Sequence, residues 1–242
     1  MVGSLWKTNP MPQIITAKLK LITTPEQGQA LRQTQLAYRD ALNAVSCYAF
    51  EQGKTSNATR LHKGMYAELR ARYHLPSQLA CSVERQVAAT YKGLWTKLRK
   101  NAEARKAGHT KKRYRGLDAA SKFVSPTLEY QVGRDYSFKT EQRVSILTLH
   151  GRVVLPYTGY DQHVAFILRG ASLGGAKLWY DKPRKQFYLL VSLQVELAPP
   201  TPQTHTGIVG IDVGIRYLAV TATTTGKQAF YSGKHIVPKA NH

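Results

Sequence analysis

Acidic residues are scarce in this sequence, which has 14 Asp and Glu against 35 Lys and Arg and a formal net charge of +21 over 242 residues. So large an excess of positive charge is unusual for a globular protein. It favours a polyanion, because each cation that neutralises a phosphate releases a condensed counterion. The composition therefore predicts nucleic acid as the partner.

Long apolar runs are also absent. The sequence has no run of ~18 apolar residues that would span a bilayer and no signal-peptide core, which argues against a membrane as the polyanion. Its hydrophobic content of 43% is still sufficient to bury one or two ordinary cores. We therefore expect a folded, cytoplasmic protein without a membrane partner.

Cysteine is nearly absent, since the chain has only 2, Cys47 and Cys81, and they form no CxxC pair. Disulfide frameworks and zinc sites normally show paired cysteines or histidines at ligand spacing. We expect both thiols to be buried in helices in a reducing compartment, and we expect no zinc site. For the same reason no metal is assigned to the histidines His62, His74, His109, His150, His163 and His205.

Residues 24–117 are predicted to form a helical lobe with a basic C-terminal stretch. Thr24 starts an N-cap signature, with a proline at the first helical position and an acidic residue after it. Apolar residues then recur at helical spacing in three segments, which Gly53 and Pro76 separate. Ser77 is expected to cap the third helix.

The regions on either side of this lobe are predicted to form a β-barrel. Residues 1–23 comprise a leader and a first strand that alternates apolar and polar side chains, and residues 118–198 contain short alternating runs divided by turn residues. A small barrel or curved sheet is the expected product. Its strands are expected at 13–21, 136–138, 144–149, 153–155, 164–168, 176–180 and 187–195, with a hairpin loop at 181–186.

A proline-rich linker, residues 199–206, is expected to lead into a separate domain at 207–242. That domain begins with a buried-strand pattern that one acidic residue, Asp212, interrupts. A buried carboxylate costs several kcal/mol unless it is paired or bound to a metal. Strands are expected at 207–214, 217–222 and 227–232.

The most basic stretch follows the third helix, and only Glu103 offsets it. Most charge runs of this kind are solvated helix ends that bind nothing. Here the basic character of the whole chain and the interleaved Tyr114 favour contact with phosphate. The predicted nucleic-acid-binding residues are Arg99, Lys100, Arg105, Lys106, Lys111, Lys112, Arg113 and Arg115.

Aromatic residues are a second source of possible nucleic-acid contacts. Tyr91 and Trp95 lie at helical spacing and are predicted to be core residues. The sheet region holds further aromatic residues, some packed inside and some free to stack on bases. They are Tyr130, Tyr136, Phe138, Tyr157, Tyr160, Trp179, Tyr180 and Tyr188.

The sequence resembles the TnpB family of insertion-sequence proteins, which are related to the type V CRISPR effector nucleases. The most specific match is the hairpin 176–196, the proline linker and the segment 209–219 around Asp212; the early strand and the long helix through 38–43 also match. The resemblance implies an α+β fold: a wedge-type β-barrel with an inserted helical recognition lobe, then the first strands of an RNase H-like (RuvC) domain.

The resemblance also implies a function. The family cleaves DNA in bacteria and archaea with a guide RNA and Mg²⁺, so guide RNA and target DNA are the implied partners, in the cytoplasm at the nucleoid. Base pairing rather than the protein reads the sequence. Asp212 matches the first of three catalytic, metal-binding carboxylates.

The sequence departs from this family after Asp212, because no Asp, Glu or Cys follows it. One carboxylate lacks the oxygen ligands that two divalent ions need. We therefore expect a truncated nuclease that binds without cutting and holds no metal stably, unless a downstream nuclease half or a full-length relative completes the site. The alternatives are a nuclease-dead guided repressor or regulator, an inert gene remnant, an actin-like ATPase fragment, or Asp212 as a polar residue at a strand end.

Overall fold

The computed structural model describes residues 12–125, 127–196, 209–214 and 217–232, which fall into two compact units. One unit contains the described residues from 12 to 196, and the other contains those from 209 to 232. The predicted linker 199–206 and the leader before residue 12 lie outside the described residues. Within the described ranges, no helix combines the length and the apolar character needed to cross a membrane.

The three predicted helices are present in the larger unit. They are α1 (Pro25–Glu51), α2 (Ala58–Arg72) and α3 (Ser77–Lys106). Thr24 caps α1 as expected, in a capping box in which its hydroxyl accepts from the Gln27 N–H while the Gln27 side chain accepts from the Thr24 N–H. The expected Ser77 cap is wrong: Pro76 is the N-cap of α3, and Ser77 is already helical and makes no capping bond.

The helices bury one apolar stripe each and pack against one another. Tyr38 of α1, Leu61 of α2 and Val83 of α3 are all fully buried. Tyr91 is a core residue as predicted, and its hydroxyl donates to the Ser46 carbonyl at 2.9 Å. The same prediction is wrong for Trp95, which is 42% exposed because it lies beyond the contact with α1 and bonds to the Lys54 carbonyl instead.

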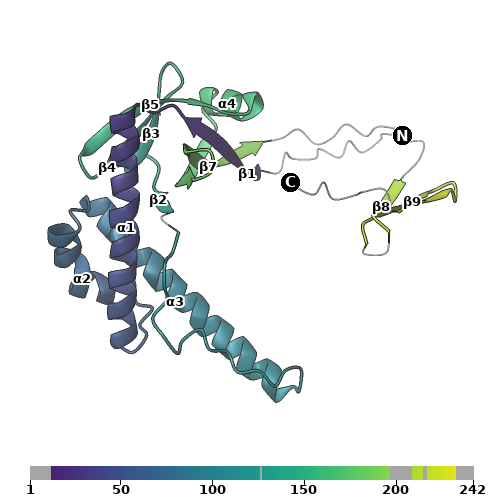
Figure 1. Ribbon diagram of the computed structural model, residues 1–242, viewed down its shortest axis with the longest axis horizontal. Coiled ribbons are helices and arrows are strands. Elements are labelled where there is room, and N and C mark those ends of the chain that lie inside the picture. Colours follow the sequence, from purple (N-terminus) through teal and green to yellow (C-terminus); the bar gives the residue numbers. More distant parts are fainter. Residues whose placement is uncertain (1–11, 126, 197–208, 215–216, 233–242) are drawn as a thin grey trace, which may run out of the picture. The chain divides into compact units, whose positions relative to one another are not determined.

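The seven strands of this unit form an antiparallel, nearly closed barrel in the order β2-β6-β7-β1-β5-β4-β3. Because β1 pairs with β7 and β5, the helices α1 to α3 are inserted after the first barrel strand, as predicted (Figure 1). The strands are β1 (Pro12–Leu21), β2 (Leu128–Tyr130), β3 (Tyr136–Lys139), β4 (Arg143–Thr148), β5 (Gly151–Thr158), β6 (Ser172–Asp181) and β7 (Gln186–Glu196).

Two buried tyrosines join the ends of this sheet through the barrel interior. Tyr136 of β3 donates to the Gly174 carbonyl of β6 at 2.6 Å, and Tyr130 of β2 donates to the Leu147 carbonyl of β4 at 2.7 Å. Each bond satisfies a polar group that burial would otherwise leave without water. These two hydrogen bonds therefore tie the ends of the sheet together.

Two further sequence expectations about this unit are wrong. Residues 164–168 belong to a helix, α4 (Asp161–Leu168), which buries Val164 and Ile167 at helical spacing. Periodicity cannot separate a helix from a strand in so short an apolar run. The cysteines are not buried either: Cys47 is exposed and Cys81 half-buried, because both lie beside the apolar stripes of their helices.

The smaller unit is an antiparallel meander of β8 (Val209–Asp212), β9 (Ala219–Thr223) and β10 (Gln228–Tyr231), as the tail pattern predicted. The expectation of a buried first strand is wrong, because every residue of β8 is exposed. No helix within the described residues of this unit covers either face of the sheet. An RNase H-like continuation stays a prediction.

Candidate nucleic-acid interface

The predicted basic stretch forms an exposed surface at the C-terminal end of α3. Residues 99–106 complete the helix, and residues 111–115 belong to the segment that follows. Figure 1 shows this end of α3 reaching away from α1 and α2. The predicted cations are all exposed: Arg99, Lys100, Arg105, Lys106, Lys111, Lys112, Arg113 and Arg115.

Asn101 brings the two parts of this stretch together. Its Nδ2 donates to the Lys112 carbonyl at 3.0 Å, and its Oδ1 accepts from the Tyr114 N–H at 2.9 Å. The segment after α3 is therefore held against the helix end. Arg113 pairs with Asp118 at 2.7 Å, so its charge is partly neutralised.

A second basic surface lies on the outward face of the barrel, where the sequence alone did not single it out. The Lys18 ammonium lies 5.0 Å from the ring centroid of Trp179 and 4.3 Å from that of Tyr188. The two rings are stacked, with centroids 5.4 Å apart and planes at 30°. We call Lys18, Trp179 and Tyr188 the aromatic platform. It combines a π-face with a fixed positive charge.

Strand alternation explains why these side chains share one face. In β1, Ala17 and Leu19 are fully buried while Lys18 and Lys20 are exposed. Trp179 is the direct cross-strand partner of Tyr188. Of the aromatic residues that the sequence left undecided, Tyr130, Tyr136 and Tyr157 are buried, whereas Trp179 and Tyr188 are half-buried on the outer face.

A groove of about 940 Å³ lies between α3 and the strands that carry the platform. Arg85 and Lys177 supply its cations, and Glu129 pairs with Lys177 at 3.3 Å. Lys177 lies two positions from Trp179 on the same face of β6, so one strand supplies a residue to the groove and a residue to the platform. The groove is lined by Thr16, Ser82, Arg85, Gln86, Ala89, Thr90, Glu129, Tyr130, Gln131, Gly175, Ala176, Lys177, Leu190 and Ser192.

A buried carboxylate, Asp135, supports the loop at one end of this groove. Its Oδ2 accepts from the Gln131 N–H at 2.8 Å, while its Oδ1 has no hydrogen-bond partner. Burial raises the pKa of Asp135 above its ordinary value, although the Gln131 N–H and the nearby guanidinium of Arg152 oppose the shift. The loop that supplies Gln131 to the groove therefore contains a carboxyl group that folding makes harder to ionise.

Asp212, the predicted catalytic carboxylate, lies exposed at the end of β8. The described residues of its unit contain no second Asp or Glu. Divalent magnesium requires several oxygen ligands in octahedral geometry. The residues present around Asp212 therefore do not fit a two-metal site.

One cluster of ligand-type side chains was missed by the sequence reasoning. His62 of α2 lies beside Cys81 and Glu84 of α3, with their ligand atoms within 4.8 Å of one another. The ligands come from two helices, so no local spacing shows them. The Cys81 and Glu84 pair at helical spacing was the only signal available in the sequence.

Comparison with known proteins gives no family. No protein-family model matches the sequence, and no curated protein matches it. Among solved structures, the chain is similar to a cryo-EM CRISPR-Cas12f ternary complex, with a TM-score of 0.40 and 13% identity over 85% of this chain and 47% of that one. It is also similar to a Cas12f1–sgRNA–target DNA complex, with a TM-score of 0.42 and 12% identity over 87% and 51%. The chain spans about half the length of these proteins.

Proposed function

We propose that this chain binds guide RNA and target DNA as the nucleic-acid-binding part of a TnpB-like, RNA-guided DNA endonuclease. The observation that carries the proposal is the aromatic platform, which lies on the strands that line the groove. Stacked, half-buried aromatic rings beside a lysine suit a nucleobase, which every sequence can supply. The net charge of +21 supports a polyanionic ligand independently.

The two basic surfaces have different roles in this proposal. The exposed cations at the end of α3 neutralise phosphates along the strand, which fixes register without reading sequence. The platform holds bases by stacking. Because neither surface presents a pattern of hydrogen bonds specific for one base, sequence selection falls to the guide RNA, as in RNA-guided nucleases generally.

Cleavage is not part of the activity proposed for this chain by itself. Asp212 is exposed and has no neighbouring carboxylate among the described residues, so it cannot hold the metal pair that phosphodiester hydrolysis uses. This observation favours a second candidate function, a guided DNA-binding regulator of a full-length relative. Both candidates bind RNA and DNA, and they differ in whether another chain supplies the missing carboxylates.

Capture of RNA from cells that express the chain tests the proposal. We expect one enriched, guide-like transcript after washing at physiological salt, and the purified complex should bind DNA complementary to it. Recovery of no enriched transcript, together with binding of micromolar strength or weaker, would sink both candidates. A plasmid assay with Mg²⁺ separates them from an active enzyme: cutting that survives Asp212→Ala would show that another site cleaves.

A further inference from the structure

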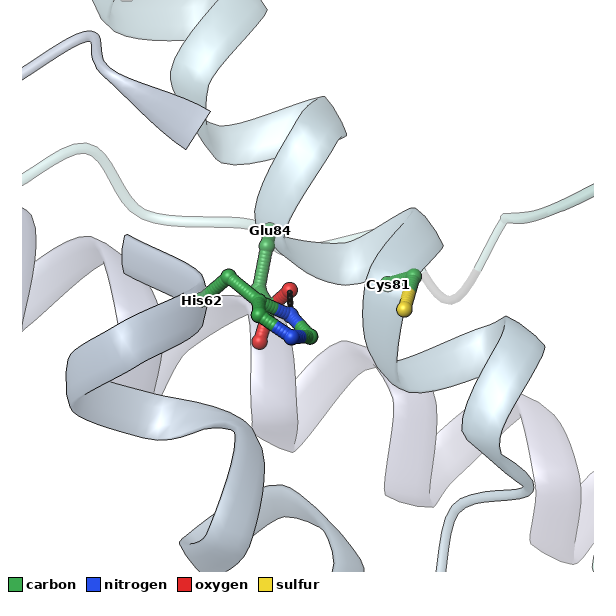
Figure 2. A group of neighbouring side chains, drawn as sticks. All are labelled: His62, Cys81 and Glu84. Atoms are coloured by element: carbon green, nitrogen blue, oxygen red, sulfur yellow. Dashed lines mark hydrogen bonds and ion pairs between the residues drawn. The ribbon is translucent and has the colours of Figure 1, made fainter. Parts of the chain in front are cut away.

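The helical lobe contains a cluster of three different metal-ligand types that the nucleic-acid interface does not use. His62 supplies an imidazole, Cys81 a thiol and Glu84 a carboxylate, and their ligand atoms lie within 4.8 Å of one another. Figure 2 shows His62, from α2, against Glu84 of α3, with Cys81 one turn away on the same helix. The Nδ1 of His62 lies 2.7 Å from Oε2 of Glu84.

Glu84 is unusual because its carboxylate is buried without full compensation. The residue is 2% exposed, and its Oε1 has no hydrogen-bond partner. A buried polar oxygen without a partner needs an explanation, and a bound ion is one that the neighbouring imidazole and thiol can help to hold.

The neighbouring arginine makes no hydrogen bond to this oxygen. Arg85 follows Glu84, but its Nε donates to the Cys81 carbonyl at 3.2 Å and its Nη2 donates to the Ser82 hydroxyl at 3.2 Å. The unpartnered oxygen of Glu84 therefore receives no hydrogen bond from it. A metal ion bound by His62, Cys81 and Glu84 would neutralise this buried carboxylate.

We propose that His62, Cys81 and Glu84 bind one Zn²⁺ ion, which joins α2 to α3. One nitrogen, one sulfur and one oxygen donor suit zinc, which accepts all three, whereas magnesium and calcium prefer oxygen alone. His62 has a side-chain exposure of 46%, so water can reach the site and occupy a fourth position. As the zinc–sulfur bond forms, the thiol proton of Cys81 leaves to solvent.

The geometry requires only small adjustments. Ligands at about 2.0 to 2.3 Å from a tetrahedral zinc lie roughly 3.3 to 3.8 Å from one another. The His62–Glu84 pair must open from its hydrogen bond at 2.7 Å, and the other separations, which are at most 4.8 Å, must shorten by about 1 Å. The side chain of His62 has room to turn because it is partly in solvent.

Zinc titration of the full, untagged chain after removal of metal with a chelator tests this site. We expect one tightly bound Zn²⁺ per chain and, with Co²⁺ as a spectroscopic probe, a thiolate-to-cobalt charge-transfer band. Cys81→Ser should abolish that band and weaken zinc binding by 10-fold or more, and His62→Gln and Glu84→Gln should weaken binding similarly. The matched controls, Cys47→Ser and His109→Gln, should leave both readouts unchanged.

Thermal unfolding followed by circular dichroism guards against variants that fail to fold. Zinc should raise the Tm of the wild-type chain and of Cys47→Ser, and it should leave the Tm of folded Cys81→Ser unchanged. Binding of no zinc at low micromolar concentration, or binding that Cys81→Ser leaves intact, overturns the proposal. In that case the cluster would be only a hydrogen bond between His62 and Glu84, with the Cys81 thiol nearby but without a function. The nucleic-acid proposal does not depend on this result.

Discussion

At the scale of single residues, the tyrosine hydroxyls inside the barrel differ in what they contribute. Tyr136 donates to the Gly174 carbonyl across the gap between the sheet edges, and burial raises its pKa to about 12. Tyr157 is equally a barrel residue, but its buried hydroxyl has no partner. The tyrosine hydroxyl therefore stabilises the fold at Tyr136, where it is hydrogen-bonded, and destabilises it at Tyr157, where it is buried without a partner.

Replacing each tyrosine by phenylalanine should separate these two cases. Tyr136→Phe leaves the Gly174 carbonyl without its donor, so we expect a loss of about 1 to 2 kcal/mol in the free energy of unfolding. Tyr157→Phe removes an unpaired hydroxyl and should be neutral or stabilising. Urea unfolding of both variants measures the difference, and equal losses would show that the Tyr136 bond does not hold the barrel edges.

Asp135 provides a pH-dependent test. Because burial raises its folded-state pKa, the folded protein keeps the proton to a higher pH than the unfolded chain does. The stability from this group is present in full below the unfolded pKa of about 3.9 and is lost as the pH rises through the folded value. Asp135→Asn keeps an oxygen to accept from Gln131 but does not titrate.

We therefore expect the stability of Asp135→Asn, relative to the wild type, to increase as the pH rises from about 4 toward neutrality. Chemical unfolding at a series of pH values measures this difference. A difference that stays constant with pH, or that changes in the opposite direction, contradicts the assigned shift.

At the scale of elements, the C-terminal end of α3 is the most direct test of phosphate contact. Lys111→Glu with Lys112→Glu changes two exposed cations and leaves the Arg113–Asp118 pair in place. If these lysines contact phosphates, the slope of log affinity against log salt should fall by about 1 for each of them. Salt titration of RNA binding measures the slope.

The control for this variant lies in the hairpin of β3 and β4. Lys139 and Arg143 are exposed cross-strand partners far from the end of α3 in the sequence. Reversal of both charges changes the net charge by the same amount. If the control lowers the slope as much as the α3 variant does, general charge rather than this surface governs binding.

The long helices and the long strand β7 were predictable from the sequence, and the short helix α4 was not. The helices α1 and α3 repeat their apolar spacing over many turns, and β7 alternates strictly, so one physical period dominates each segment. The helix α4 has only 8 residues, too few for the two periods to separate. The predictions that Trp95 and the two cysteines are buried were wrong. These side chains lie at the edge of the apolar stripe of their helix, where the packing of the neighbouring helix decides whether they are covered.

The candidate site was predictable only where it is local in sequence. The basic stretch is a contiguous run, and composition alone reveals it. The aromatic platform depends on the register of β6 with β7 and of β7 with β1, which sets Trp179 opposite Tyr188 beside Lys18. Likewise, His62 meets Cys81 and Glu84 only through the packing of α2 on α3.

At the scale of the whole molecule, the charge and the architecture support the same ligand. A net charge of +21 attracts any polyanion, but it selects no geometry. The larger unit adds the geometry, because its groove lies between a basic helix and a sheet face that carries stacked aromatic rings. Among its described residues, the smaller unit contains one carboxylate, the exposed Asp212, and we assign no binding role to this unit.

The most direct test of the central claim is the affinity of the full chain for RNA and for an RNA–DNA duplex at physiological salt, measured by fluorescence anisotropy. Trp179→Ala combined with Tyr188→Ala should weaken binding roughly 10- to 100-fold, since stacking contributes about 1 to 3 kcal/mol per base. The control is Tyr160→Ala, at an exposed tyrosine outside the platform, which should bind as the wild type does. An affinity that the double variant leaves unchanged, with its fold intact, would contradict the account.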